Sequence, residues 1–115
     1  MIQVFDVVKM YDGSNPVLDS FSMEIAKGEF VFLTGSSGAG KTTILKILFG
    51  QERFEKGQVL VHGINVGKLT HKNMYTLRRS MGVVFQDYKL LPNKTVFENV
   101  SFAQEVIGRD RKTIR

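Results

Sequence analysis

The pattern of apolar and polar positions in the first half of the chain predicts three strands followed by one helix. Residues 2–9 form an apolar-rich run typical of a strand, and from Phe21 apolar residues alternate with polar ones, which predicts a second, half-buried strand. The uninterrupted apolar run 30–33 predicts a buried strand. Residues 43–49 have apolar positions at helical spacing, and Gly50 is suited to end that helix.

The second half of the chain predicts two further strands and a weak helix. Residues 57–63 alternate between two glycines, as expected of a short strand. Residues 69–80 weakly favour a helix, and residues 81–85 predict another buried strand.

A stronger helix signal begins at Thr95. Thr95 and Glu98 have the spacing of a capping box, in which each side chain accepts a hydrogen bond from the backbone of the other residue. Apolar residues then recur on one helical face, at Phe97, Val100, Ala103 and Ile107. Gly108 is expected to end this helix.

The last residues predict the start of one more helix. Asp110 is suited to an N-cap position, and residues 111–115 would form the first turn. Because a single helical turn has no cooperative stability of its own, we expect the chain to be truncated within this element.

The residues between the predicted strand 30–33 and the predicted helix 43–49 carry a phosphate-binding pattern. The pattern G-x-x-x-x-G-K-[ST] is matched at every fixed position by Gly35, Ser36, Ser37, Gly38, Ala39, Gly40, Lys41 and Thr42. In a strand–loop–helix context, the glycines let backbone N–H groups surround a phosphate chain, and the helix N-terminus adds its positive field. Lys41 would reach the terminal phosphates and Thr42 would bind Mg²⁺. The pattern therefore predicts binding of a nucleoside triphosphate.

Hydrolysis requires a further residue, and the sequence leaves two candidates for it. An acidic side chain at the end of a second buried strand usually holds the Mg²⁺ water shell. Asp87 follows the predicted strand 81–85 and could serve as that acid in a very small NTPase or kinase. In the alternative, the preceding Gln86 is the functional residue and the chain holds no magnesium carboxylate. Spacing alone does not separate these hypotheses.

Composition narrows the class of protein. The net charge is +5, from 16 Lys and Arg against 11 Asp and Glu, and residues 109–115 with four bases and one acid supply +3 of it. Because the rest of the chain is nearly balanced, we expect no nucleic-acid partner. The absence of cysteine excludes disulfides and fits a cytoplasmic protein. No apolar run approaches the roughly 18 residues that a membrane span needs.

The whole chain resembles the ABC-type ATPases. Residues 81–86 are similar to the strand and Q-loop of that family, and residues 90–100 to the start of its helical subdomain. Tyr11 falls where the family places its adenine-stacking aromatic residue, and residues 27–30 precede the phosphate loop as they do there. Residues 86–92 most resemble the cell-division branch of the family, with the lipoprotein-export and macrolide-export branches as alternatives.

The resemblance implies an α/β P-loop NTPase fold of ABC type. An antiparallel β subdomain and part of the P-loop core sheet would be present, truncated at the start of the helical subdomain. The resemblance divides the chain into four parts. Residues 1–34 would form the β-subdomain strands that lead to the P-loop, and residues 35–50 the P-loop and its helix. Residues 57–86 would form the strands that lead to the Q-loop, and residues 87–115 the start of the helical subdomain.

The resemblance also implies roles for individual residues. Tyr11 would stack on adenine with Val17 packed beside it, and Gln86 would bind Mg²⁺ or orient the attacking water. The phosphates would be held by the nine residues from Gly35 to Thr43, with Lys41 as a catalytic group on the terminal pair and Thr43 on the α-phosphate.

Further expectations concern ligands and partners. The resemblance implies ATP and Mg²⁺ as cofactors, a second ATPase subunit in a homodimer, and an integral membrane partner that holds the protein at the inner face of the cell membrane. This sequence lacks four further features of the family: the Leu-Ser-Gly-Gly signature, the Mg²⁺-binding aspartate, the catalytic glutamate and the switch histidine. We therefore expect the chain to bind ATP with little or no hydrolysis. An unpaired central strand would favour self-association. A non-catalytic nucleotide-binding module is the remaining alternative.

Overall fold

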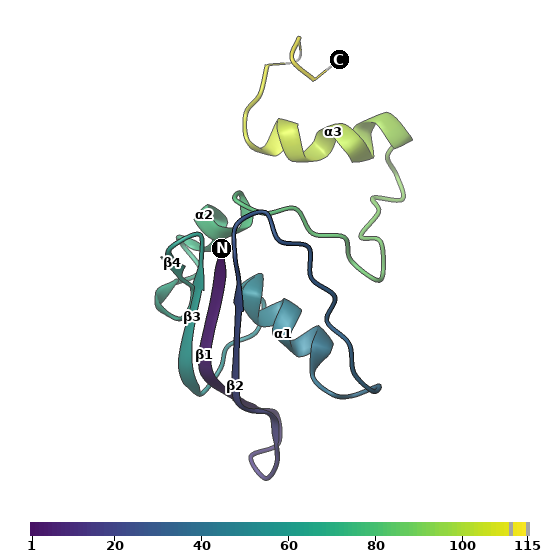
Figure 1. Ribbon diagram of the computed structural model, residues 1–115. Coiled ribbons are helices and arrows are strands. Elements are labelled where there is room, and N and C mark those ends of the chain that lie inside the picture. Colours follow the sequence, from purple (N-terminus) through teal and green to yellow (C-terminus); the bar gives the residue numbers. More distant parts are fainter. Residues whose placement is uncertain (111, 115) are drawn as a thin grey trace. The chain divides into compact units, whose positions relative to one another are not determined.

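The computed structural model describes residues 1–110 and 112–114. It divides the chain into two compact units, Met1–Gly82 and Val83–Arg115, and each is described below by itself (Figure 1).

The first unit is built on a four-stranded sheet with the strand order β2-β1-β3-β4. All three strand pairs are antiparallel. The strands are β1 (Ile2–Met10), β2 (Pro16–Ile25), β3 (Lys56–Val61) and β4 (Ile64–Asn65). The strands predicted at 2–9, from Phe21 and at 57–63 are confirmed, and β2 begins earlier than its alternating pattern because it continues to Pro16 opposite Met10.

β1 is a central strand with an irregular ladder to both neighbours. Its pairing with β3 shifts register between Phe5 and Val8. Gly57 lies opposite this shift with φ +96°, and a Cβ there would be 2.5 Å from the Phe5 carbonyl oxygen. The irregular ladder therefore requires glycine at this position.

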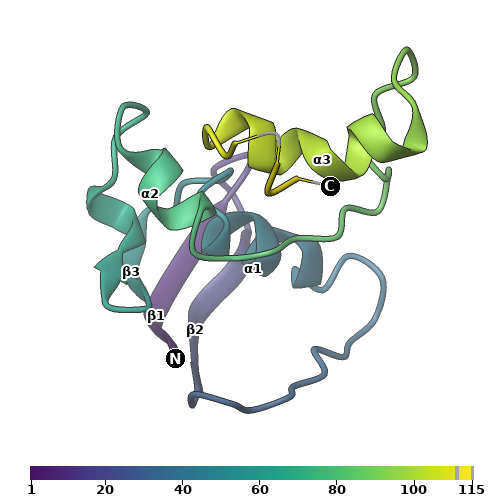
Figure 2. The same ribbon diagram turned by 90° about the horizontal axis from the view of Figure 1, so that it is seen from above.

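Helix α1 (Lys41–Leu48) packs against the sheet and forms the core with it. Figures 1 and 2 both show α1 alongside β1 and β2. The buried apolar side chains come from the strands, from α1 and from the segment after β4: Val4, Val7, Leu18, Ile44, Ile47, Leu48, Val59, Val61, Val66 and Leu77. Gly50 follows the helix with φ +70°, as predicted.

Two short helical segments complete the first unit. A 3₁₀ turn, η1 (Val66–Lys68), follows β4, and α2 (Met74–Arg78) is shorter than the helix expected over 69–80. Leu77 is completely buried. Arg78 donates to the backbone oxygens of Phe49 and Gly50, so α2 is fastened to the end of α1.

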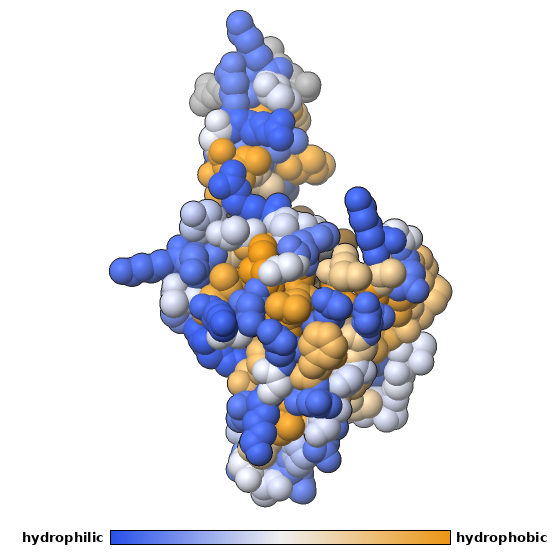
Figure 3. Space-filling view, turned by 60° about the vertical axis from the view of Figure 1, so that its left-hand side comes forward, coloured by the Kyte–Doolittle hydropathy of each residue, from blue (hydrophilic) through white to orange (hydrophobic). Residues whose placement is uncertain are grey.

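The strands predicted at 30–33 and 81–85 are not formed in the structure. Neither segment pairs with a strand among the described residues, and an apolar run without a hydrogen-bonded neighbour does not make a sheet. Phe30 is 84% exposed and Phe32 79%, with their rings edge to face at 5.0 Å, and Val84 is 98% exposed. On the face drawn in Figure 3, apolar side chains also reach the surface between hydrophilic ones.

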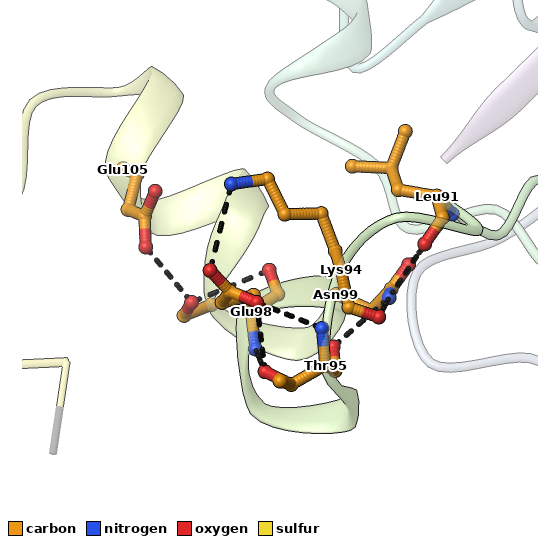
Figure 4. A network of polar contacts seen from close by, with 7 residues as sticks. Leu91, Lys94, Thr95, Glu98, Asn99 and Glu105 are labelled. Atoms are coloured by element: carbon orange, nitrogen blue, oxygen red, sulfur yellow. Dashed lines mark hydrogen bonds and ion pairs between the residues drawn. The ribbon is translucent and has the colours of Figure 1, made fainter.

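The second unit contains α3 (Val96–Val106), whose N-terminus carries the predicted capping box. Glu98 N–H donates to Thr95 Oγ1 at 3.2 Å, and Thr95 N–H donates to Glu98 Oε2 at 2.7 Å (Figure 4). Asn99 exchanges hydrogen bonds with the backbone of Leu91, so the preceding loop is fastened to the helix. Ile107 is the C-cap of α3 and Gly108 follows it with φ +75°, so the predicted end of the helix at Gly108 is confirmed.

The predicted apolar face of α3 is open rather than packed, with Phe97 57% and Val100 76% exposed. Beyond it, the predicted helix start falls partly outside the described residues, because 111 and 115 are not among them. Within the described part, Thr113 N–H donates to Asp110 O at 2.9 Å, which is a turn. Among the described residues, no helix has the length and apolar character needed to cross a membrane.

Candidate functional site

The phosphate-binding pattern lies on an exposed loop that enters α1 at its N-terminus. Residues 34–39 are exposed, and the turn from Ser36 to Ala39 is closed by a backbone hydrogen bond of 3.2 Å. Gly40 is the N-cap of α1, and its φ of +93° is a conformation that glycine adopts readily. The loop therefore passes directly into the first turn of the helix.

Gly40 packs closely against β2. A Cβ at this position would lie 3.0 Å from Leu18 Cδ2 and 3.1 Å from the carbonyl oxygen of Val17. The structure thus brings Val17, a predicted site residue, to the end of the phosphate loop. The lack of a side chain at Gly40 permits this contact.

The first turn of α1 presents backbone donors at the loop. The first backbone hydrogen bond of the helix runs from Ile44 N–H to Gly40 O at 2.9 Å. The N–H groups of Lys41, Thr42 and Thr43 consequently have no acceptor within the helix. Together with the helix dipole, these donors suit an anion.

Lys41 lies across the loop. Its Nζ donates to the carbonyl oxygens of Gly35 at 2.7 Å and Ser36 at 2.6 Å. These two bonds hold the Lys41 ammonium against the backbone oxygens of the loop. The positive charge and the first-turn donors of α1 belong to one loop–helix segment.

Tyr11 lies at the end of β1 and contacts the same helix. Its hydroxyl is 3.2 Å from Thr43 Oγ1, and Thr43 is buried. The Tyr11 residue is 55% exposed, so part of its ring is open to solvent. The structure therefore places Tyr11, Val17 and the loop around the N-terminus of α1.

Lys9, Glu52 and Glu55 beside Tyr11 were not identified from the sequence. Lys9 Nζ lies 4.9 Å from the centre of the Tyr11 ring and 3.7 and 3.6 Å from Glu52 and Glu55 carboxylate oxygens. The one available signal was the i, i+2 spacing of Lys9 and Tyr11 at the end of a strand.

The sequence also matches a known protein family. The sequence profile of the family described as ABC transporter matches residues 18–114. The chain belongs to this family. The α/β fold of an ABC ATPase cassette, expected from the resemblance, is thereby confirmed.

Individual ABC proteins resemble the chain over all or nearly all of its length. The cell division ATP-binding protein FtsE of Streptococcus pneumoniae is 47% identical and that of Bacillus subtilis 44%, each over 100% of this chain and 50% of the relative. The dimeric structure of the bacterial ABC transporter cassette MJ0796 has a TM-score of 0.90 at 30% identity, covering 99% of this chain and 52% of that one. A second MJ0796 structure is a post-hydrolysis state bound to ADP and Pi. The chain thus spans about half the length of these relatives.

Gln86 and Asp87 lie in the second unit. Asp87 is exposed and forms an ion pair with Lys89, with Oδ2 2.6 Å from Nζ. The hydrogen bond from the Lys89 side chain lowers the pKa of Asp87 below its ordinary value. The roles of both residues toward Mg²⁺ stay predictions. Among the residues that the structure describes, no group of three or more His, Asp or Glu side chains is arranged to hold a metal ion.

Proposed function

We propose that this chain is the nucleotide-binding half of an ABC-type ATPase and that it binds ATP together with Mg²⁺. The observation that carries the proposal is the loop at the start of α1. There the Lys41 ammonium donates to the Gly35 and Ser36 carbonyl oxygens, and the first turn of α1 has three backbone N–H groups without helical acceptors. Charge and directed donors on one glycine loop are suited to a phosphate chain.

The relatives support ATP as the ligand and FtsE as the functional analogue. The similar FtsE proteins carry the name of cell division ATP-binding proteins, and the MJ0796 cassette holds ADP and Pi in one of its structures. A lipoprotein-export or macrolide-export type of ABC ATPase is the alternative within the family.

The residues around the loop fit the roles that the resemblance implies. The exposed ring of Tyr11 would stack on adenine with Val17 beside it, and Thr43 would contact the α-phosphate. Thr42 is exposed in the first turn of α1, so its hydroxyl is accessible to a hydrated cation. The resemblance implies Gln86 as a further Mg²⁺ ligand, and the ion would supply charge neutralisation of the phosphates.

Hydrolysis and membrane coupling are assigned to a longer assembly. Residues 1–115 contain no Leu-Ser-Gly-Gly signature, so we propose that this chain binds ATP but hydrolyses it poorly or not at all. The complete ATPase would work as a homodimer with an FtsX-like integral membrane subunit or a permease. This partner would place it at the cytoplasmic face of the membrane.

A nucleotide titration of the chain tests the proposal. Isothermal titration calorimetry with ATP and Mg²⁺ should show saturable binding, and Lys41→Ala should weaken it at least about tenfold, since a hydrogen-bonded charge contributes about 1.5–3 kcal/mol. Lys46→Ala is the matched control, because it removes a lysine from the opposite end of the same helix. Equal affinity of Lys41→Ala and the unaltered chain would refute the proposal.

A turnover assay separates this proposal from the small NTPase or kinase hypothesis. We expect little or no phosphate release by the chain above the buffer rate. Rapid release that Asp87→Ala abolishes and Gln86→Ala preserves would instead favour the hypothesis in which Asp87 holds the Mg²⁺ water shell.

A further inference from the structure

Lys9 is a buried cation next to the Tyr11 ring. The residue is 8% exposed, and lysine is almost never buried this far unless its charge is paired. Glu52 and Glu55 provide that pairing at 3.7 and 3.6 Å. The ammonium is also 4.9 Å from the centre of the Tyr11 ring, within the range of a cation–π contact.

The Glu55 carboxylate and the Glu52 backbone are each fixed by a backbone hydrogen bond. Glu55 Oε2 accepts a hydrogen bond from Met10 N–H at 2.9 Å, and Glu55 N–H donates to Val8 O at 3.0 Å. The N–H of Glu52 donates to Lys46 O at 3.3 Å, at the end of α1. The Lys9 side chain therefore joins β1 to the segment between α1 and β3, which supplies both glutamates.

The Tyr11 ring is consequently held at two points. Lys9 lies against its face, and the hydroxyl is 3.2 Å from Thr43 Oγ1 in the first turn of α1. Lys9 of β1 pairs with Leu18 of β2, and Leu18 is also the residue that packs against Gly40 at the end of the phosphate loop. The remaining exposed part of the ring stays open beside the loop.

We propose that Lys9, held by Glu52 and Glu55, is a positioning residue for the Tyr11 ring and thereby for the base of the nucleotide. This inference rests on the proposed function, since it assumes that a nucleotide occupies the loop. The cluster of one ammonium and two carboxylates carries a formal charge of −1, so it does not attract the phosphates. Its action on the ligand passes through Tyr11.

This arrangement gives a ligand-dependent expectation. Removing the Lys9 charge frees the ring on the face where it was held, and stacking of a base on an aromatic ring depends on its orientation. A ligand without a base makes no contact with Tyr11. Loss of the Lys9 charge should therefore weaken the binding of ATP and leave the binding of inorganic tripolyphosphate unchanged.

Calorimetric titrations of the full chain with ATP and with tripolyphosphate, both with Mg²⁺, test this inference. Lys9→Met should weaken ATP binding by about threefold to tenfold and leave tripolyphosphate binding unchanged. Lys9→Arg should restore ATP binding, because arginine keeps the cation over the ring. Lys72→Met, which removes an exposed lysine, is the matched control.

A double-mutant cycle with Tyr11→Ala shows whether Lys9 acts through the ring. In the Tyr11→Ala background, Lys9→Met should weaken ATP binding no further. If Lys9→Met does not fold, Lys9→Gln decides, because its amide can still donate to the two glutamates. Unchanged ATP affinity, or an equal loss for ATP and tripolyphosphate, would overturn the inference. Failure of the unaltered chain to bind either ligand would overturn the proposed function itself.

Discussion

Replacement of Gly40 by alanine tests how tightly the phosphate loop packs against β2. Gly40 has φ +93°, and an added Cβ would lie 3.0 Å from Leu18 Cδ2, 3.1 Å from Val17 O and 3.3 Å from Val17 Cγ1. A left-handed backbone costs a residue other than glycine about 1–2 kcal/mol, and crowding of a packed site adds about 1–3 kcal/mol. We therefore expect Gly40→Ala to lower the free energy of unfolding by about 2–5 kcal/mol.

Gly63→Ala is the control that separates these two contributions. Gly63 has φ +77°, but an added Cβ would have no atom within 4 Å. The Gly63→Ala variant should therefore lose only the backbone contribution to its free energy of unfolding, about 1–2 kcal/mol. Alanine also restricts the unfolded chain, and this smaller stabilising effect is the same in both variants and cancels from their difference.

Urea denaturation of both variants, followed by circular dichroism, measures the difference. Gly40→Ala should be less stable than Gly63→Ala by at least about 1 kcal/mol, with unchanged dependence on urea concentration. Its ATP affinity should fall as well, because the crowding moves the start of α1 away from Val17. Equal losses in the two variants would show that Gly40 is not packed against β2 and would refute the reasoning.

Three further predictions concern α3 and the sheet. Thr95→Ala should destabilise α3 by about 1 kcal/mol, measured by amide hydrogen exchange. The control Gln104→Ala, at an exposed position of the same helix, should leave α3 unchanged. Equal effects of the two substitutions would contradict the capping role of Thr95. The pKa of Glu98 lies below its ordinary value, chiefly because the Thr95 N–H donates to it. Its stabilising contribution is therefore present above the pKa of glutamate in the unfolded chain and is lost as the pH falls through the lowered value. A carbon-13 NMR titration in which the Glu98 midpoint is not below that of glutamate in the unfolded chain would disprove this. In urea, Gly57→Ala should lower the free energy of unfolding more than Gly40→Ala. The added Cβ at position 57 would lie 2.5 Å from the backbone oxygen of Phe5, and a backbone atom cannot rotate away as a side chain can. A smaller loss than for Gly40→Ala would show that the irregular β1–β3 ladder does not require glycine at position 57.

Elements with local signals could be predicted from the sequence. Gly50 ends α1 and the capping box at Thr95 starts α3, because both depend only on residues within one turn. The segments 30–33 and 81–85 were predicted wrongly as strands. A strand requires a hydrogen-bonded neighbour, and apolar composition carries no information about whether one is present.

The candidate site was partly predictable for a similar reason. The spacing of the phosphate loop is itself the signal, and Tyr11 was found through the resemblance of the whole chain to a family. Glu52 and Glu55 lie more than forty positions after Lys9, which makes their cluster a product of tertiary structure. Lys9 by itself resembles any polar residue at the end of a strand.

The position of β1 between β2 and β3 has a consequence for synthesis of the chain. Ile25 at the end of β2 pairs with Ile2, and Lys56 at the start of β3 pairs with Val8. The connection that holds the phosphate loop and α1 is thus tied at both ends to one strand. On the ribosome, β1 and β2 can form a hairpin once residue 25 has emerged, but the other edge of β1 gains its partner only with residues 56–61. A nascent chain arrested after Thr43 and before Lys56 contains every residue of the phosphate loop and lacks β3, the strand that closes the connection around it.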